Sequence, residues 1–82
     1  MHVTMNYNGQ RYLVELIPPA VEVKPPATII RVTPKAGEQS SMDIQIKPEL
    51  ATPWYWGGRL TAKGLREVGH LAILEYIAFY GD

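Results

Sequence analysis

Polar and apolar residues alternate along the first half of the chain, as they do in strands with one buried face. Residues 2–7 and 10–17 both follow this period, and Asn8-Gly9 lies between them. Asn-Gly tolerates the two positive φ angles of a type I′ turn, so the pattern predicts a hairpin over 2–17. Its register puts most of the apolar side chains on one face, which we take as the core side: Val3, Met5, Tyr7, Tyr12, Val14 and Leu16.

Two more segments alternate in the same way, near residues 28–33 and 42–47. Between the hairpin and the first of them, Pro-Pro-Ala occurs twice and brackets residues 21–24. Proline cannot donate a hydrogen bond to a β-ladder, so 21–24 is either a short edge strand or an extended polyproline-II arm. We therefore expect an antiparallel sheet of four or five strands.

The C-terminal quarter predicts one long helix over about 61–80. Thr61 is suited to cap its beginning and Gly81 its end. Gly64 and Gly69 lower the helix propensity, and we expect them to permit close approach of the sheet backbone. The stripe that should face the sheet has i, i+3 and i+4 spacing: Leu65, Val68, Gly69, Ala72, Tyr76 and Phe79. The chain is thus predicted to be a single α+β domain over 1–82, with the helix packed on the sheet.

The polar face of this helix ends at His70. Beyond it, apolar side chains occupy the side that should face solvent: Ile73, Leu74, Ile77 and Tyr80. Monomers tolerate little contiguous apolar surface, so this excess predicts a covering partner. We expect a homodimer or another protein at these four residues. The alternative is coverage within the monomer, by the Pro-rich segment or by the loop that holds the tryptophans.

Three consecutive aromatic residues precede the helix, and basic residues follow them: Trp54, Tyr55 and Trp56, then Arg59, Lys63 and Arg66. Aromatic and basic side chains together suit single-stranded nucleic acid, which makes binding at this patch the second hypothesis. Eight basic and eight acidic side chains cancel, which weighs against a partner dominated by phosphate. We expect at least one Trp to cover the core and at least one to be exposed.

The chain offers little for catalysis. It has no Cys, and it has no Gly-rich phosphate loop between a strand and a helix. Glu67-x-x-His70 has the spacing of a metal-binding pair, but few further ligands accompany it. We expect no catalytic, cofactor-binding or metal-binding residues and a non-enzymatic interaction module. A small enzyme or metal-binding protein is the least favoured alternative.

The longest apolar run spans about ten residues and contains Glu75, which is too short to cross a bilayer. The N-terminus lacks the basic and apolar regions of a signal peptide. We therefore expect a soluble, cytoplasmic protein without a membrane contact.

Overall fold

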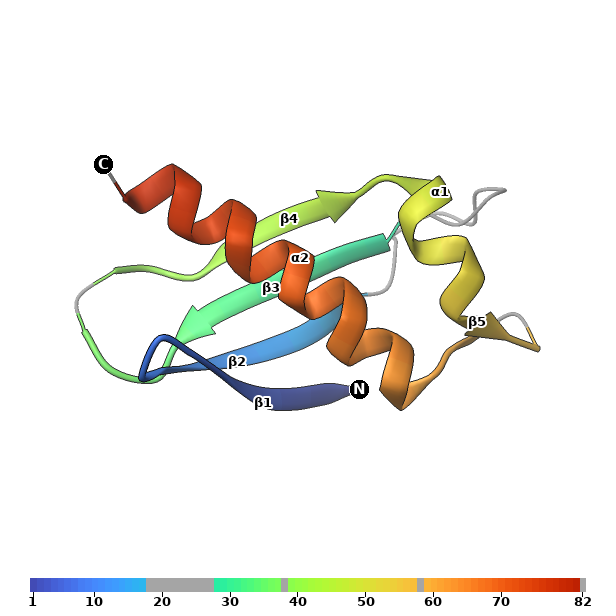
Figure 1. Ribbon diagram of the computed structural model, residues 1–82, viewed down its shortest axis with the longest axis horizontal. Helices are drawn as coiled ribbons and strands as arrows, with labels where there is room; N and C mark the ends of the chain where they lie inside the picture. The colour runs from blue at the N-terminus through green and yellow to red at the C-terminus, as the bar shows by residue number, and fades with distance from the viewer. Residues whose placement is uncertain (18–27, 38, 58, 82) are drawn as a thin grey trace.

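A four-stranded antiparallel sheet is crossed on one face by a long C-terminal helix (Figure 1). The computed structural model describes residues 1–17, 28–37, 39–57 and 59–81. The elements in chain order are β1 (His2–Tyr7), β2 (Gln10–Ile17), β3 (Thr28–Pro34), β4 (Met42–Ile46), α1 (Pro48–Ala51), the 3-10 turn η1 (Thr52–Trp54), β5 (Tyr55–Trp56), β6 (Arg59–Leu60) and α2 (Ala62–Tyr80). The α+β architecture predicted from the sequence is confirmed.

The N-terminal hairpin has the predicted register. Tyr7 lies opposite Gln10, and the pairing continues to His2 opposite Glu15. Asn8 has φ of 50° and Gly9 has φ of 80°, so both turn residues adopt the positive φ that a type I′ turn requires. The predicted edge strand at 21–24 lies outside the described residues.

The strands pair in the order β1-β2-β3-β4, so every neighbour in the sheet is also a neighbour in the chain. β4 ends at Ile46, one residue before the predicted boundary, because Lys47 caps α1 and Pro48 occupies its first turn. A connection of several short elements joins β4 to α2. It contains α1, η1 and the small hairpin of β5 and β6, in which Trp56 pairs with Arg59.

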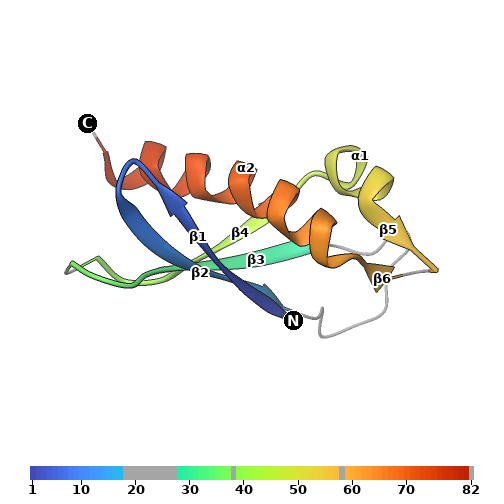
Figure 2. The same ribbon diagram turned by 60° about the horizontal axis from the view of Figure 1, so that its bottom comes forward.

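Helix α2 begins and ends where the capping residues predict. The Thr61 hydroxyl accepts a hydrogen bond from the Gly64 amide at 2.9 Å, and the Gly81 amide donates to the Ile77 carbonyl at 2.6 Å. Both α1 and α2 lie on the same side of the four-stranded sheet (Figure 2). Within the part of the chain that the structure describes, no helix is long and apolar enough to cross a membrane.

The core lies between this face of the sheet and α2. Its buried apolar residues come from β2, β3 and β4, from α2 and from the connection between β4 and α2: Tyr12, Val14, Ile30, Val32, Ile44, Ile46, Ala51, Leu60, Leu65, Val68, Ala72, Ile73 and Tyr76. Gly69 permits close approach, as predicted, but its neighbours are the side chains of Val14 and Met5 rather than sheet backbone.

Candidate functional site

The four helix residues predicted to meet a partner do not form one surface. Ile73 is completely buried, which corrects the expectation that it faces outward. It follows Gly69 by one helical turn and therefore lies on the same side of α2, over the first two strands. The buried stripe is wider than predicted because α2 crosses all four strands, and Ile73 belongs to the core.

Phe79 requires the opposite correction. It was placed on the stripe that faces the sheet, yet 70% of it is exposed. The spacing is right for that stripe, but Phe79 belongs to the last turn of α2, which extends past the beginning of β4 (Figure 1). At that position β4 does not extend beneath the helix to cover the ring.

Leu74 lines a groove on the side of α2 that faces β4. The groove has a volume of about 460 Å³. Leu50 of α1 and Leu74 of α2 are 48% and 38% exposed, respectively. We call this surface the leucine groove; its residues are Ile44, Gln45, Ile46, Lys47, Leu50, Leu71, Leu74 and Glu75. It combines an apolar floor with one basic and one acidic side chain.

β4 forms an edge of the sheet beside the leucine groove. Among the described strands it pairs only with β3. Asp43 and Gln45 are exposed on the sheet face opposite α2. The Arg31 guanidinium donates two hydrogen bonds to Asp43, at 2.7 and 3.1 Å. These bonds lower the pKa of the Asp43 carboxyl, so Asp43 carries its negative charge beside this edge at neutral pH.

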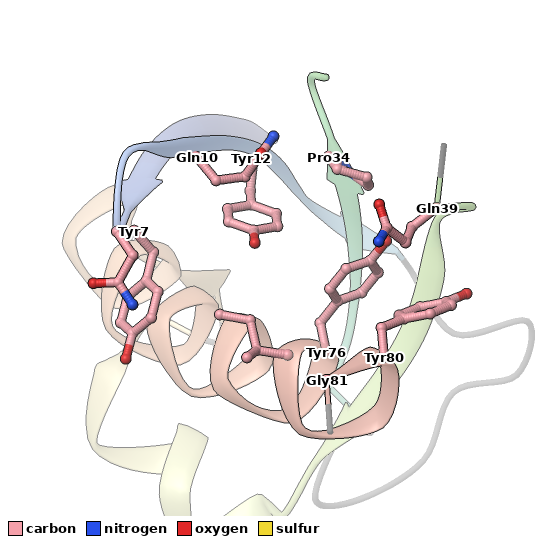
Figure 3. Close-up of a pocket in the computed structure, with 10 residues that line it drawn as sticks. Tyr7, Gln10, Tyr12, Pro34, Gln39, Tyr76, Tyr80 and Gly81 are labelled. Atoms are coloured by element: carbon pink, nitrogen blue, oxygen red, sulfur yellow. The ribbon is translucent and has the colours of Figure 1, made fainter. Parts of the chain in front are cut away.

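Ile77 and Tyr80 lie at a different place, in a pocket between the end of α2 and the turn of the N-terminal hairpin (Figure 3). The pocket has a volume of about 330 Å³. We call it the tyrosine pocket; its residues are Tyr7, Asn8, Gln10, Tyr12, Pro34, Gln39, Tyr76, Ile77, Tyr80 and Gly81. The predicted interface is therefore divided between the core, the leucine groove and the tyrosine pocket.

The rings of the tyrosine pocket pack on one another. Tyr76 lies edge-on to Tyr12, with centroids 5.8 Å apart, and Tyr80 follows at 4.7 Å from Tyr76. The Tyr76 hydroxyl donates a hydrogen bond to the Ser40 carbonyl at 2.8 Å. Burial raises the pKa of Tyr76, and the neighbouring Tyr80 and Tyr12 add to this increase.

The sequence did not reveal this pocket. Tyr7, Tyr12 and Tyr76 were predicted to face the core. Their hydroxyl groups are the feature of the sequence from which a pocket could have been predicted. A buried tyrosine needs a polar partner or water for its hydroxyl, so three tyrosines on core-facing positions indicate a wet or ligand-accessible region.

The aromatic residues before α2 divide as predicted between core and surface. Trp54 is partly buried and packs on the core, whereas Trp56 is 81% exposed. The Lys63 ammonium lies 5.9 Å from the centre of the Trp54 ring, and the Tyr55 hydroxyl lies 2.6 Å from that of Thr28.

Four of the six residues of the predicted nucleic-acid patch form two separate pairs, and the six do not form one continuous surface. Trp54 is paired with Lys63, and Trp56 with Arg59. Arg66 is exposed on α2, and no hydrogen bond or ion pair among the described residues joins it to either pair. Tyr55 has its hydroxyl directed to Thr28 of the sheet and is only partly accessible.

Glu67 and His70 have no third ligand nearby. In residues 1–17, 28–37, 39–57 and 59–81, no group of three His, Cys, Asp or Glu side chains could hold a metal ion. The His70 ring instead lies 5.7 Å from the Tyr7 ring, outside the tyrosine pocket.

Comparison with known proteins gives no functional assignment, because no family model, curated protein or solved structure matches the chain. Three surfaces described above have the exposure and chemistry to bind a partner. They are the leucine groove with the edge of β4, the tyrosine pocket, and the exposed Trp56 hairpin.

Proposed function

We propose that this protein is a non-enzymatic interaction module that forms a homodimer through the edge of β4 and the leucine groove. The observation that carries the proposal is the position of two half-exposed leucines, Leu50 and Leu74, directly beside an edge strand. An unpaired edge offers main-chain hydrogen bonds to another strand, and the leucines offer apolar surface next to it. One partner can bind the strand edge through hydrogen bonds and cover the two leucines at the same time.

The sequence of β4, extended by one residue to Lys47, is complementary to itself. Antiparallel pairing of two copies about a twofold axis at Gln45 sets Asp43 of each chain opposite Lys47 of the other. It also sets Ile44 opposite Ile46 on the side that carries α2. Opposite charges at facing positions stabilise an antiparallel pair, and this register supplies two such pairs because the axis repeats the contact.

Other registers of the same pairing are less favourable. A shift of two residues in either direction preserves the faces of the sheet but removes both Asp43–Lys47 pairs. One of these shifts also sets Ile44 opposite Pro48, which cannot donate a hydrogen bond to the ladder. The charges of Asp43 in β4 and of Lys47 directly after it therefore select one register, which supports a second copy of this chain as the partner.

The oligomeric state tests the proposal directly. Size-exclusion chromatography with light scattering at micromolar concentration should give the mass of a dimer. Leu74→Glu should give a folded monomer, because it places a charge in the leucine groove. Phe79→Glu is the matched control, since Phe79 is exposed outside that groove.

Two outcomes would contradict the proposal. A monodisperse wild-type monomer excludes self-association. A dimer that is dissociated by Ile77→Glu but unaffected by Leu74→Glu would use the side of α2 that faces the tyrosine pocket instead.

Single-stranded nucleic acid is the second candidate, and one observation favours it. Trp56 is 81% exposed at the end of β5, in a hairpin whose two strands have two residues each. It lies beside its cross-strand partner Arg59. An exposed ring can stack on a base while the guanidinium contacts a phosphate. Titration with a single-stranded oligonucleotide at low salt should then quench tryptophan fluorescence, and Trp56→Ala should abolish the quenching. An unchanged spectrum at low salt excludes this candidate.

A further inference from the structure

The tyrosine pocket has a uniform chemical character. Four of its residues are tyrosines and three are neutral amides: Tyr7, Tyr12, Tyr76, Tyr80, Asn8, Gln10 and Gln39. None of the described residues that line it has a charged side chain. Tyr7 forms one wall, and Tyr76 and Tyr80 form the wall facing it (Figure 3).

One hydroxyl group in this pocket is open to solvent and free to bond a ligand. Tyr12 is only 7% exposed, and its hydroxyl is directed into the pocket (Figure 3). Among the described residues no side chain or carbonyl forms a hydrogen bond with this hydroxyl, which is accessible from the pocket, whereas the hydroxyl of Tyr76 donates to the Ser40 carbonyl. The amide N–H groups of Gln10 donate to the carbonyls of Arg11 and Ala36, which leaves the Gln10 side-chain oxygen available as an acceptor. The pocket therefore offers a bound molecule specific polar contacts.

The C-terminal end of α2 contributes a partial negative charge to the pocket. Tyr80 and Gly81, the last helical residue and its cap, both line the pocket. The unpaired carbonyl groups at a helix C-terminus act as a partial negative charge that attracts cations. The last turn of α2 contains no basic side chain that would neutralise this charge.

The aromatic rings also favour a positively charged ligand. The face of an aromatic ring attracts a cation within about 6 Å of its centre, and sites built from several such rings recognise quaternary ammonium groups. Tyr12, Tyr76 and Tyr80 form a continuous series of rings with centroid separations of 5.8 and 4.7 Å. A cation beside Tyr76 is therefore close to several rings at once.

We propose that the tyrosine pocket binds a small organic cation with an ammonium or methylated ammonium group. The pocket volume of about 330 Å³ is sufficient for a trimethylammonium group with a short polar tail. The ring faces and the C-terminus of α2 stabilise the positive charge, and the Tyr12 hydroxyl accepts or donates one hydrogen bond to the tail. This site lies away from the leucine groove and does not depend on the homodimer.

Choline and its uncharged isostere 3,3-dimethylbutan-1-ol provide a matched pair of probes. They have the same shape, and only choline carries the positive charge. Titration of the full chain, followed by calorimetry or by the NMR signals of the tyrosine rings, should show saturable choline binding. The alcohol should bind about tenfold more weakly, because it lacks the attraction to several rings.

Variants then locate the binding site. Tyr80→Leu removes a ring that is 39% exposed, so the fold should survive, and choline affinity should fall about fivefold. Phe79→Leu is the matched control, since Phe79 is the adjacent aromatic residue and does not line the pocket. Its choline affinity should equal that of the wild type.

Three results would overturn the proposal. The first is the absence of saturable choline binding, and the second is equal affinity for choline and the alcohol. The third is an equal loss of affinity in Tyr80→Leu and Phe79→Leu, which would place the binding outside the pocket. A wild-type monomer in solution would contradict the proposed dimer and leave this assignment unchanged.

Discussion

Gly64 of α2 and Trp54 of η1 are in direct contact. A Cβ atom on Gly64 would lie 2.5 Å from the Trp54 Cβ and 2.9 Å from the Trp54 carbonyl oxygen. The Thr61 amide also donates a hydrogen bond to that carbonyl, at 3.2 Å. The segment between β4 and α2 is therefore fixed to the first turn of the helix through backbone and Cβ atoms.

Gly64→Ala should destabilise the protein by about 1–3 kcal/mol, because the added methyl group displaces Trp54. In a helix with free space, the same substitution would stabilise by about 1 kcal/mol. Urea denaturation followed by circular dichroism measures the difference. Arg66→Ala, at an exposed position of the same helix, should change the free energy of unfolding by less than about 0.5 kcal/mol. A more stable Gly64→Ala variant would contradict the contact.

Thr61→Ala should reduce the free energy of unfolding by about 1 kcal/mol. The Thr61 hydroxyl accepts from the Gly64 amide at 2.9 Å, and the variant leaves this donor without a partner. Thr61→Ser retains the hydroxyl, so it should retain most of the stability. Equal melting temperatures for the Ala and Ser variants would show that the cap contributes nothing.

Tyr76 should make the protein less stable at alkaline pH. Its pKa is raised above the ordinary value of 10.0, first by burial and then by Tyr80 and Tyr12. The folded state therefore favours the neutral phenol. The resulting contribution to stability is complete below pH 10.0 and is lost as the pH rises from there through the raised pKa of the folded state.

Tyr76→Phe removes this ionisation and also the hydrogen bond to the Ser40 carbonyl. The variant should be less stable by about 1 kcal/mol at neutral pH. Above pH 10.0 its stability should fall less steeply than that of the wild type. Urea midpoints measured across the alkaline range provide the comparison, and parallel pH profiles would contradict the assignment to Tyr76.

Lys47→Glu tests the register proposed for the dimer. In the dimer, the twofold axis makes this substitution set a glutamate opposite Asp43 of the partner subunit twice. The dimer Kd should rise about tenfold, because each facing pair contributes up to about 1 kcal/mol. Lys63→Glu makes the same change of charge on α2, away from β4, and should leave Kd unaltered. Sedimentation equilibrium measures both values. If the two variants weaken the dimer equally, net charge is responsible and the register is wrong.

The hairpin and the long helix could be predicted because local residues determine them. Asn8-Gly9 specifies a turn that only one register satisfies, and Thr61 and Gly81 mark the two ends of α2. The connection after β4 was missed because its elements are only two to four residues long. Elements of this length show no periodicity, and Gly64 could not be linked to Trp54 before both were placed in space.

The faces of α2 were harder to predict than its ends. Helical spacing gives the angle of each side chain about the axis, but it does not show where the sheet beneath ends. Ile73 is completely buried on a side of the helix that was expected to face outward, and Phe79 is exposed because β4 does not reach under its side of the last turn. The tyrosine pocket combines β1, β2, the segment after β3 and α2, so it depends on the tertiary arrangement alone.

The meander order of the sheet has a consequence for the time course of folding. Each strand pairs with the strand before or after it in the chain, so the sheet can assemble through short loop closures, which is typical of rapidly folding proteins. The helix that covers the sheet is synthesised after all four of its strands. A nascent chain that ends at Ile46 already contains Val14, Ile30 and Val32 but lacks α2 to cover them. Until the ribosome releases α2, this apolar surface is a site for chaperones or aggregation.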